Sequence, residues 1–89
     1  MAITIATLRE EITLTINSVL GDAEGAIPVL ALFSLVRGAL GRANDINTHT
    51  RDAYMFKEVL KSSVYTVNRG PGGGVWFTSV YEAYKARNQ

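Results

Sequence analysis

The sequence predicts an α+β fold in which three helices precede a β-hairpin and a short helical turn ends the chain. Three observations lead to this prediction. Apolar residues recur at helical spacing over residues 7–20 and 47–62, and an almost continuous apolar run fills residues 29–40. Residues 64–67 and 75–79, on either side of a glycine-rich segment, have the composition of two strands. With 89 residues, the chain has the length of one small domain, so we expect residues 1–89 to fold as a single unit.

The composition is that of a folded protein, with 47% hydrophobic and 19% charged residues. Because the chain has no cysteine, it can form neither a disulfide nor a thiolate metal site, which fits a reducing, cytoplasmic setting. The segment "MAITIATLREE" has no basic region of the kind that opens a signal peptide. The apolar stretch 26–36 is shorter than the roughly 20 residues that span a bilayer, so we expect no membrane partner.

The first helix is predicted over residues 7–20. Thr7 and Glu10 form a capping-box pattern, and Gly21 stands where a left-handed C-cap would end the helix. The segment "ITLTI", residues 12–16, alternates like a strand. The longer helical period, which includes both caps, favours a helix.

The second helix is predicted to follow Pro28 and to run over residues 29–40. Nearly every side of this helix is apolar, so most of its surface must be covered. The first and third helices and the hairpin are one possible cover. A second copy of the chain, bound through this helix as a homodimer, is the other.

The third helix is predicted to start at Asn47, Thr48 or Thr50, which are all acceptable N-caps, and to run to about Ser62. Its inward stripe is predicted to consist of Ala53, Phe56, Val59 and Leu60. Its other side, which we expect to face solvent or a ligand, carries Arg51, Asp52, Lys57, Glu58 and Lys61.

The segment "RGPGGG", residues 69–74, joins the two predicted strands as a long hairpin loop. Strand alternation places Trp76 and Phe77 on opposite sides of the hairpin, so one of them is expected in the core. Residues 81–87 are predicted to form one or two helical turns.

This order of elements, three helices followed by a strand, a glycine-rich loop and a second strand, is similar to that of the winged-helix domain over residues 7–79. The resemblance implies a helix-turn-helix DNA-binding protein that regulates transcription, with its third helix in the major groove and its wing on the backbone or minor groove of double-stranded DNA. It implies that Thr48, His49, Thr50 and Arg51 face bases, that Lys57 and Lys61 contact the backbone, and that Arg69 is the wing contact. Glycines around Arg69 would leave its approach to a phosphate unobstructed.

Charge is unevenly distributed although the net charge is only +1, since the first third of the chain is acidic and the remainder basic. The arrangement of the basic residues in space therefore discriminates between functions. If they line one side of the molecule, nucleic-acid binding is favoured, and if they scatter, it is disfavoured. The residues in question are Arg37, Arg42, Arg51, Lys57, Lys61 and Arg69.

No pattern of catalysis is present in the sequence. His49 is the only histidine, and neither a Ser-His-acid set nor metal-ligand spacing occurs, so we expect no enzyme activity, no metal and no cofactor. The competing hypothesis is a small protein-protein interaction module, or an inhibitor of a larger complex, that uses the second helix or the aromatic hairpin as its contact surface.

Overall fold

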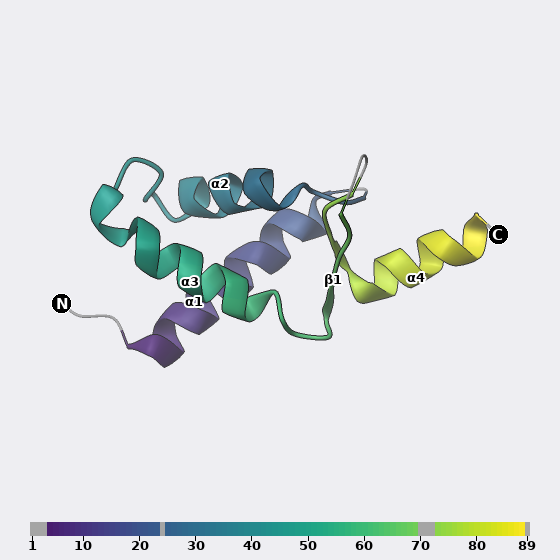
Figure 1. Cartoon of the computed structure of the whole chain (residues 1–89), viewed down its shortest axis with the longest axis horizontal. Coiled ribbons are helices and arrows are strands. Elements are labelled where there is room, and N and C mark those ends of the chain that lie inside the picture. The colour runs from purple at the N-terminus through teal and green to yellow at the C-terminus, as the bar shows by residue number, and fades with distance from the viewer. Residues whose placement is uncertain (1–3, 24, 70–72, 89) are drawn as a thin grey trace.

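The computed structural model describes residues 4–23, 25–69 and 73–88. Within these ranges the chain forms helices first, then a two-stranded antiparallel hairpin, then a final helix (Figure 1). This arrangement confirms the predicted α+β fold. In chain order the elements are α1 (Ile5–Gly21), α2 (Val29–Ala39), the 3-10 turn η1 (Ile46–Thr48), α3 (His49–Val59), β1 (Tyr65–Val67), β2 (Val75–Phe77) and α4 (Thr78–Arg87).

Helix α1 begins earlier than predicted, because Thr4 rather than Thr7 is its N-cap. The Thr4 hydroxyl oxygen accepts a hydrogen bond from the Thr7 amide (3.1 Å) and donates one to the Thr7 hydroxyl (2.8 Å). At the other end, Gly21 is the last helical residue and Asp22 is a right-handed C-cap. The capping box at Thr7 and the left-handed cap at Gly21 were therefore wrong.

Replacing Thr4 by alanine is expected to lower the free energy of unfolding by about 1 kcal/mol, because the Thr7 amide loses its acceptor. The matched control is Thr7→Ala, which keeps the backbone amide and its bond to Thr4 and should cost less. Urea unfolding followed by circular dichroism measures both. A larger loss in Thr7→Ala than in Thr4→Ala would contradict the assignment of the cap.

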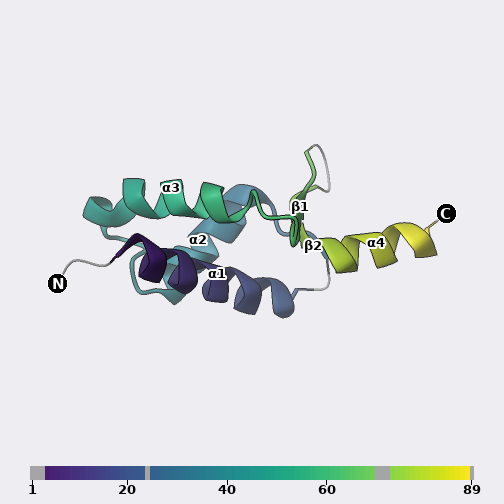
Figure 2. The same cartoon turned by 90° about the horizontal axis from the view of Figure 1, so that it is seen from below.

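The core lies between the first three helices, with α1 packed against both α2 and α3 (Figures 1 and 2). Buried residues of α1 recur every four positions, which confirms the helical interpretation of "ITLTI". Ile5, in the first turn of α1, is exposed. Helix α3 ends at Val59 rather than at the predicted Ser62. Of its predicted stripe, Phe56 and Val59 are buried together with Met55, whereas Ala53 and Leu60 are only partly buried. The buried apolar residues are Leu8, Ile12, Ile16, Leu20, Leu32, Val36, Met55, Phe56, Val59, Tyr65 and Val75.

Helix α2 ends in a Schellman motif. Gly41 has a φ of 73°, its amide bonds the Gly38 carbonyl (3.1 Å), and the Arg42 amide bonds the Arg37 carbonyl (2.8 Å). A left-handed glycine at this position turns the chain sharply back. The turn brings the side chains of Arg37 and Arg42 to the same carboxylate.

The hairpin is tied to the helices through the segment that precedes α2. β1 and β2 pair with Thr66 opposite Trp76. Ile27 forms an isolated antiparallel bridge with Val75, through hydrogen bonds of 3.1 Å and 2.8 Å between their backbones. Of the two aromatic residues of β2, Phe77 packs against the core and stacks on Tyr65.

Helix α4 is longer than the one or two turns predicted, and it includes Ser79, which was wrongly placed in a strand. It extends away from the three-helix body, with the hairpin between them (Figures 1 and 2). Trp76 packs against two of its tyrosines, Tyr81 and Tyr84, at ring distances of 5.5 Å and 5.1 Å. Within the described residues, no helix has the length and apolar character needed to cross a membrane.

Candidate nucleic-acid interface

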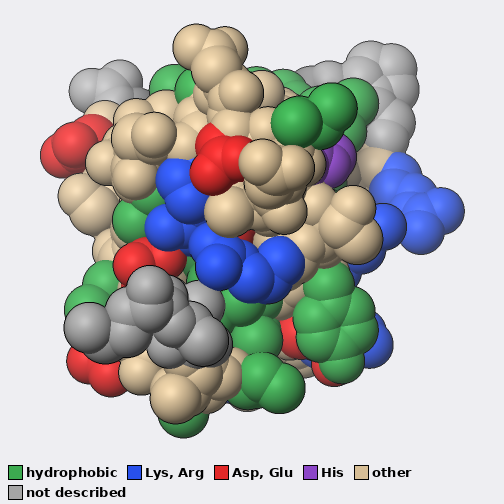
Figure 3. All heavy atoms as spheres, turned by 90° about the vertical axis from the view of Figure 1, so that its left-hand side faces the viewer, with side chains coloured by type: hydrophobic (Ala, Val, Ile, Leu, Met, Phe, Trp, Pro, Cys, Tyr) green, Lys and Arg blue, Asp and Glu red, His purple; other side chains and the backbone are tan. Residues whose placement is uncertain are grey.

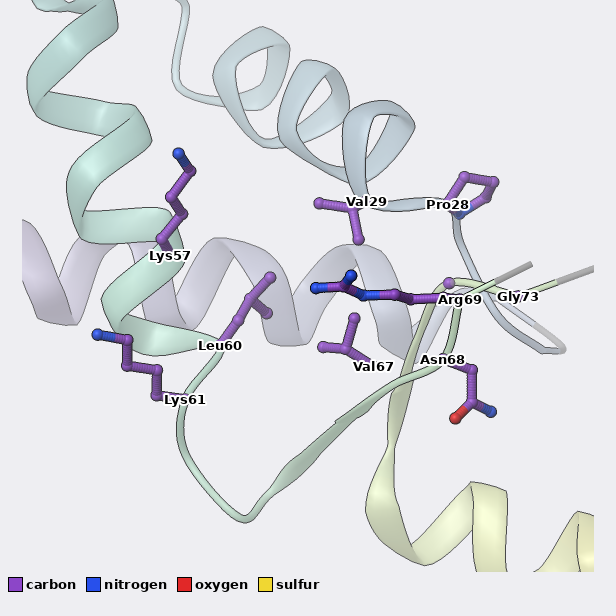
Figure 4. A pocket seen from close by; sticks show the side chains of 10 residues that line it. Pro28, Val29, Lys57, Leu60, Lys61, Val67, Asn68, Arg69 and Gly73 are labelled. Carbon is purple, nitrogen blue, oxygen red and sulfur yellow. The ribbon is translucent and has the colours of Figure 1, made fainter.

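Basic side chains from α3 and from the hairpin meet at one pocket. Lys57 and Lys61 lie on its α3 side and Arg69 follows β1 on the other, with a pocket of about 630 Å³ between them (Figure 4). Its apolar lining includes Val29, Leu60 and Val67. We call this surface the basic pocket.

The spacing of residues along α3 explains which of its side chains face the pocket. Thr50, Tyr54 and Lys57 follow one another at intervals of three or four residues and therefore share one side of α3, and Lys61 lies just beyond the helix, after its C-cap Leu60. All four side chains are exposed. The opposite side of α3 buries Met55, so the polar side is held outward by the core.

Arg69 is placed by the hairpin. Its guanidinium points from the end of β1 toward α3, between Val29 and Val67 (Figure 4). The Asn68 amide bonds the Gly74 carbonyl (2.9 Å), which closes the hairpin beside it. The expected glycine-rich tip at residues 70–72 lies outside the described residues.

The charge of the basic pocket is only partly neutralised. Lys61 pairs with Glu58 at 2.6 Å, and this hydrogen bond lowers the pKa of Glu58 and raises that of Lys61. Within the described parts of the chain, neither Lys57 nor Arg69 forms an ion pair. The pocket therefore offers positive charge to an anionic ligand.

The other predicted site residues are dispersed. Thr50 lies on the same side of α3 as Lys57, whereas His49 is exposed beside α2, with its ring edge-on to Phe33 at 5.4 Å. Thr48 and Arg51 lie apart from the basic pocket. The Thr48 hydroxyl accepts a hydrogen bond from Arg37 (3.2 Å), and Arg51 donates one to Asp52 (3.4 Å).

Asp52 was wrongly predicted on the outer side of α3, because its carboxylate is buried with 1% of its surface exposed. It accepts hydrogen bonds from Arg37 (3.3 Å) and from Arg42 (2.8 Å and 3.0 Å), and Arg42 also pairs with Glu11 of α1 (2.7 Å). We call these four residues the Asp52 cluster. It joins α1, the end of α2 and α3 through one set of charges.

The charges and hydrogen bonds of the Asp52 cluster favour the ionised state of the Asp52 carboxylate. Burial alone would raise the pKa of Asp52, but the hydrogen bonds from Arg42 and Arg37, together with the charges of Arg42 and Arg51, outweigh it and hold that pKa below its ordinary value. The hydrogen bond to Asp52 likewise raises the pKa of Arg42. At neutral pH the Asp52 carboxylate and the Arg42 guanidinium are therefore charged.

The six basic residues neither line one side of the molecule together nor scatter over all of it, so the arrangement that would favour nucleic-acid binding is met only in part. They separate into two groups. Lys57, Lys61 and Arg69 share the basic pocket, while Arg37, Arg42 and Arg51 contact Asp52. At the end of the molecule where α2 turns toward α3, basic and acidic side chains are intermixed (Figure 3). One sequence signal for the Asp52 cluster was present, since Arg37 is the only charged residue in the apolar run 29–40.

No family model, curated protein or solved structure matches this chain. Within the described residues, no group of three or more histidine or acidic side chains is placed to hold a metal ion. The geometry of the basic pocket is therefore the basis for a functional assignment.

Proposed function

We propose that this protein is a small regulatory protein that binds double-stranded DNA through the outer side of α3 and the adjoining hairpin. The observation that carries the proposal is the convergence of Lys57, Lys61 and Arg69, from two separate elements, on one pocket. Three cations spaced along a groove suit a phosphate backbone, which supplies most of the affinity of such complexes.

The shape of the molecule also supports this function. In the winged-helix arrangement α3 is the helix that enters the major groove and the hairpin is the wing. The Ile27–Val75 bridge supplies a strand pairing between the first two helices, where that family usually has a small strand. Thr50 and Tyr54, on the same side of α3 as Lys57, are then positioned to face base edges.

The apolar residues of the pocket lining support the methylene stems of its basic side chains. Leu60 and Val67 lie among the basic side chains of the pocket. Long basic side chains lay their methylene stems on such surfaces while their charged ends stay in water. The charges of the basic pocket are therefore presented at its rim rather than buried within it.

The test is fluorescence anisotropy of the protein on random-sequence duplex DNA across a range of salt concentrations. We expect binding that weakens steeply with salt. Lys57→Ala, Lys61→Ala and Arg69→Ala should each weaken it and reduce the slope of log K against log salt by about 1. Lys85→Ala is the matched control, since Lys85 is an exposed lysine on α4 and should leave both values unchanged.

Two results would reject the proposal. One is the absence of binding to DNA at low salt. The other is an equal loss of affinity in Lys85→Ala and in the variants of the basic pocket, which would indicate attraction by overall charge alone. In either case a protein partner becomes the better hypothesis.

A further inference from the structure

An apolar cavity lies between helices α2 and α3, next to the basic pocket. Both helices pack mainly against α1 and much less against each other, so the space between them is only partly filled. The cavity has a volume of about 240 Å³ and shares Val29 and Lys57 with the basic pocket. We call it the apolar pocket. Its other lining residues are Leu30, Phe33, His49, Ala53 and Phe56.

The spacing of residues along both helices makes this cavity apolar. Val29 and Phe33 are four residues apart in α2, and Ala53 and Phe56 are three apart in α3, so each pair shares one side of its helix. The rings of Phe33 and Phe56 are in contact, with centroids 5.1 Å apart. At the rim, Val29 is 37% and Leu30 is 80% exposed. The cavity is therefore lined by aromatic rings and open to a ligand.

Positive charge lies at one end of the surface that the two pockets form. In the basic pocket Lys61 is paired with Glu58 at 2.6 Å, whereas Lys57 and Arg69 form no ion pair within the described parts of the chain. In the apolar pocket, His49 and Lys57 are the only polar side chains among the described residues that line it. A ligand that fills both pockets therefore needs an anionic group at one end and an apolar body at the other.

We propose that the two pockets together bind an anion with one alkyl tail, such as the carboxylate of a fatty acid. The carboxylate would lie between Lys57 and Arg69, and the tail would pass Val29 into the apolar pocket (Figure 4). The volume of the basic pocket, about 630 Å³, is within the range of roughly 300–1,000 Å³ that is usual for small-molecule sites. A nucleotide or a peptide suits the apolar pocket less well, because its polar groups would lose water there without gaining partners.

This binding activity goes beyond the proposed function and does not depend on it, because the ligand is titrated without DNA. The two activities are connected in one respect. Lys57 and Arg69 are also the proposed contacts to DNA, so a bound fatty acid and DNA would exclude each other. That consequence alone rests on the proposed function.

The first test is isothermal titration calorimetry of the whole chain with dodecanoate, below the concentration at which dodecanoate forms micelles. We expect a single site. Each methylene group added between octanoate and dodecanoate should raise the affinity about fourfold, if it is buried. Acetate, which lacks the tail, and dodecyltrimethylammonium, which lacks the negative charge, should bind at least about tenfold more weakly than dodecanoate.

Val29→Asp is the decisive variant, because Val29 lines both pockets and the new carboxylate would repel the anion and interrupt the apolar path. Val29 is partly exposed and is the first residue of α2, where an acidic side chain is favourable, so the fold should be retained. We expect the affinity for dodecanoate to fall at least about tenfold. Leu35→Asp is the matched control, since Leu35 is an exposed leucine of the same helix outside both pockets. It should bind dodecanoate like the parent.

A second set of variants tests the position of the carboxylate. Lys57→Gln and Arg69→Gln should each weaken dodecanoate binding by about two- to fivefold, the size of a solvent-exposed ion pair. Lys57→Arg keeps the charge and should restore most of the affinity. Lys85→Gln, on α4, is the control and should have no effect.

Four results would overturn the inference. Equal binding of dodecanoate and dodecyltrimethylammonium would show that the negative charge is not recognised. An affinity that does not rise from octanoate to dodecanoate would show that the tail is not buried. Unchanged binding in Val29→Asp would place the ligand elsewhere. Binding to vesicles of anionic lipid, without binding of monomeric dodecanoate, would indicate a lipid surface as the partner instead.

Discussion

Replacing Asp52 by asparagine is expected to lower the free energy of unfolding by about 3–5 kcal/mol at neutral pH. The carboxylate is almost fully buried and accepts hydrogen bonds from both Arg37 and Arg42. Its removal leaves those guanidinium charges without their shared partner. Because a small domain has only about 5–15 kcal/mol of stability, we expect a large fall in the urea midpoint. Glu82→Gln, in an exposed pair with Lys85, is the control and should cost less than about 1 kcal/mol.

The loss of unfolding free energy in Asp52→Asn should become smaller at low pH. The pKa of Asp52 is lowered in the folded protein from an ordinary value of 3.8, because the arginine contacts outweigh the effect of burial. The stabilisation is therefore fully present above about pH 4 and is lost as the pH falls through the lower folded pKa. The difference in stability between the parent and Asp52→Asn should be constant from about pH 5 to 8 and should shrink below pH 4. A difference that stays unchanged down to about pH 2 would contradict the assignment.

Asp52 is an example of a contact that could not be predicted from the sequence pattern. Charges at residues 51, 52, 57, 58 and 61 predict one polar side of α3, but only part of that side is exposed. Asp52 is buried because the left-handed turn at Gly41 brings Arg42 back to it. A contact between elements that depends on one backbone turn leaves no periodic pattern in the sequence. The contacts of Thr48 with Arg37 and of Arg51 with Asp52 likewise leave no periodic pattern, and the sequence did not predict them.

Periodic features were predicted more successfully. The four-residue spacing from Leu8 to Leu20 identified α1 because burial follows the helical repeat. Its start was misplaced, since Thr4 and Thr7 can both cap a helix and the sequence does not rank them. Lys57 and Lys61 were predicted on one side of α3 by spacing. Their approach to Arg69 depends on how the hairpin docks against the helices, which the spacing of residues within one helix cannot predict.

Docking of the hairpin depends on Gly74. Its φ is 154°, a conformation that other residues rarely adopt, and a methyl group at this position would overlap the Ile27 carbonyl and the Pro28 nitrogen. The backbone of Val75 bonds Ile27 in both directions at this point. The close approach of two backbones therefore requires glycine.

Gly74→Ala is expected to lower the free energy of unfolding by about 3 kcal/mol or more, from backbone strain of about 1–3 kcal/mol together with weakened hydrogen bonds of about 1 kcal/mol each. Gly41→Ala separates the two causes, since Gly41 has a φ of 73° but open space around it, and should cost about 1–2 kcal/mol. Thermal and urea unfolding measure both variants. Equal losses would show that the contact with Ile27 adds nothing to the backbone strain.

The substitution also connects the fold to the proposed function, because Gly74 lines the basic pocket beside Arg69. If the hairpin loosens while the three-helix core stays folded, Gly74→Ala should weaken DNA binding about as much as Arg69→Ala does, at a temperature where far-ultraviolet circular dichroism shows intact helices. Lys57 on α3 and Lys61 just after it would remain in place, so a residual, less salt-dependent affinity is expected. Full affinity in a destabilised Gly74→Ala protein would mean that the position of Arg69 does not matter for binding, and would remove the hairpin from the interface.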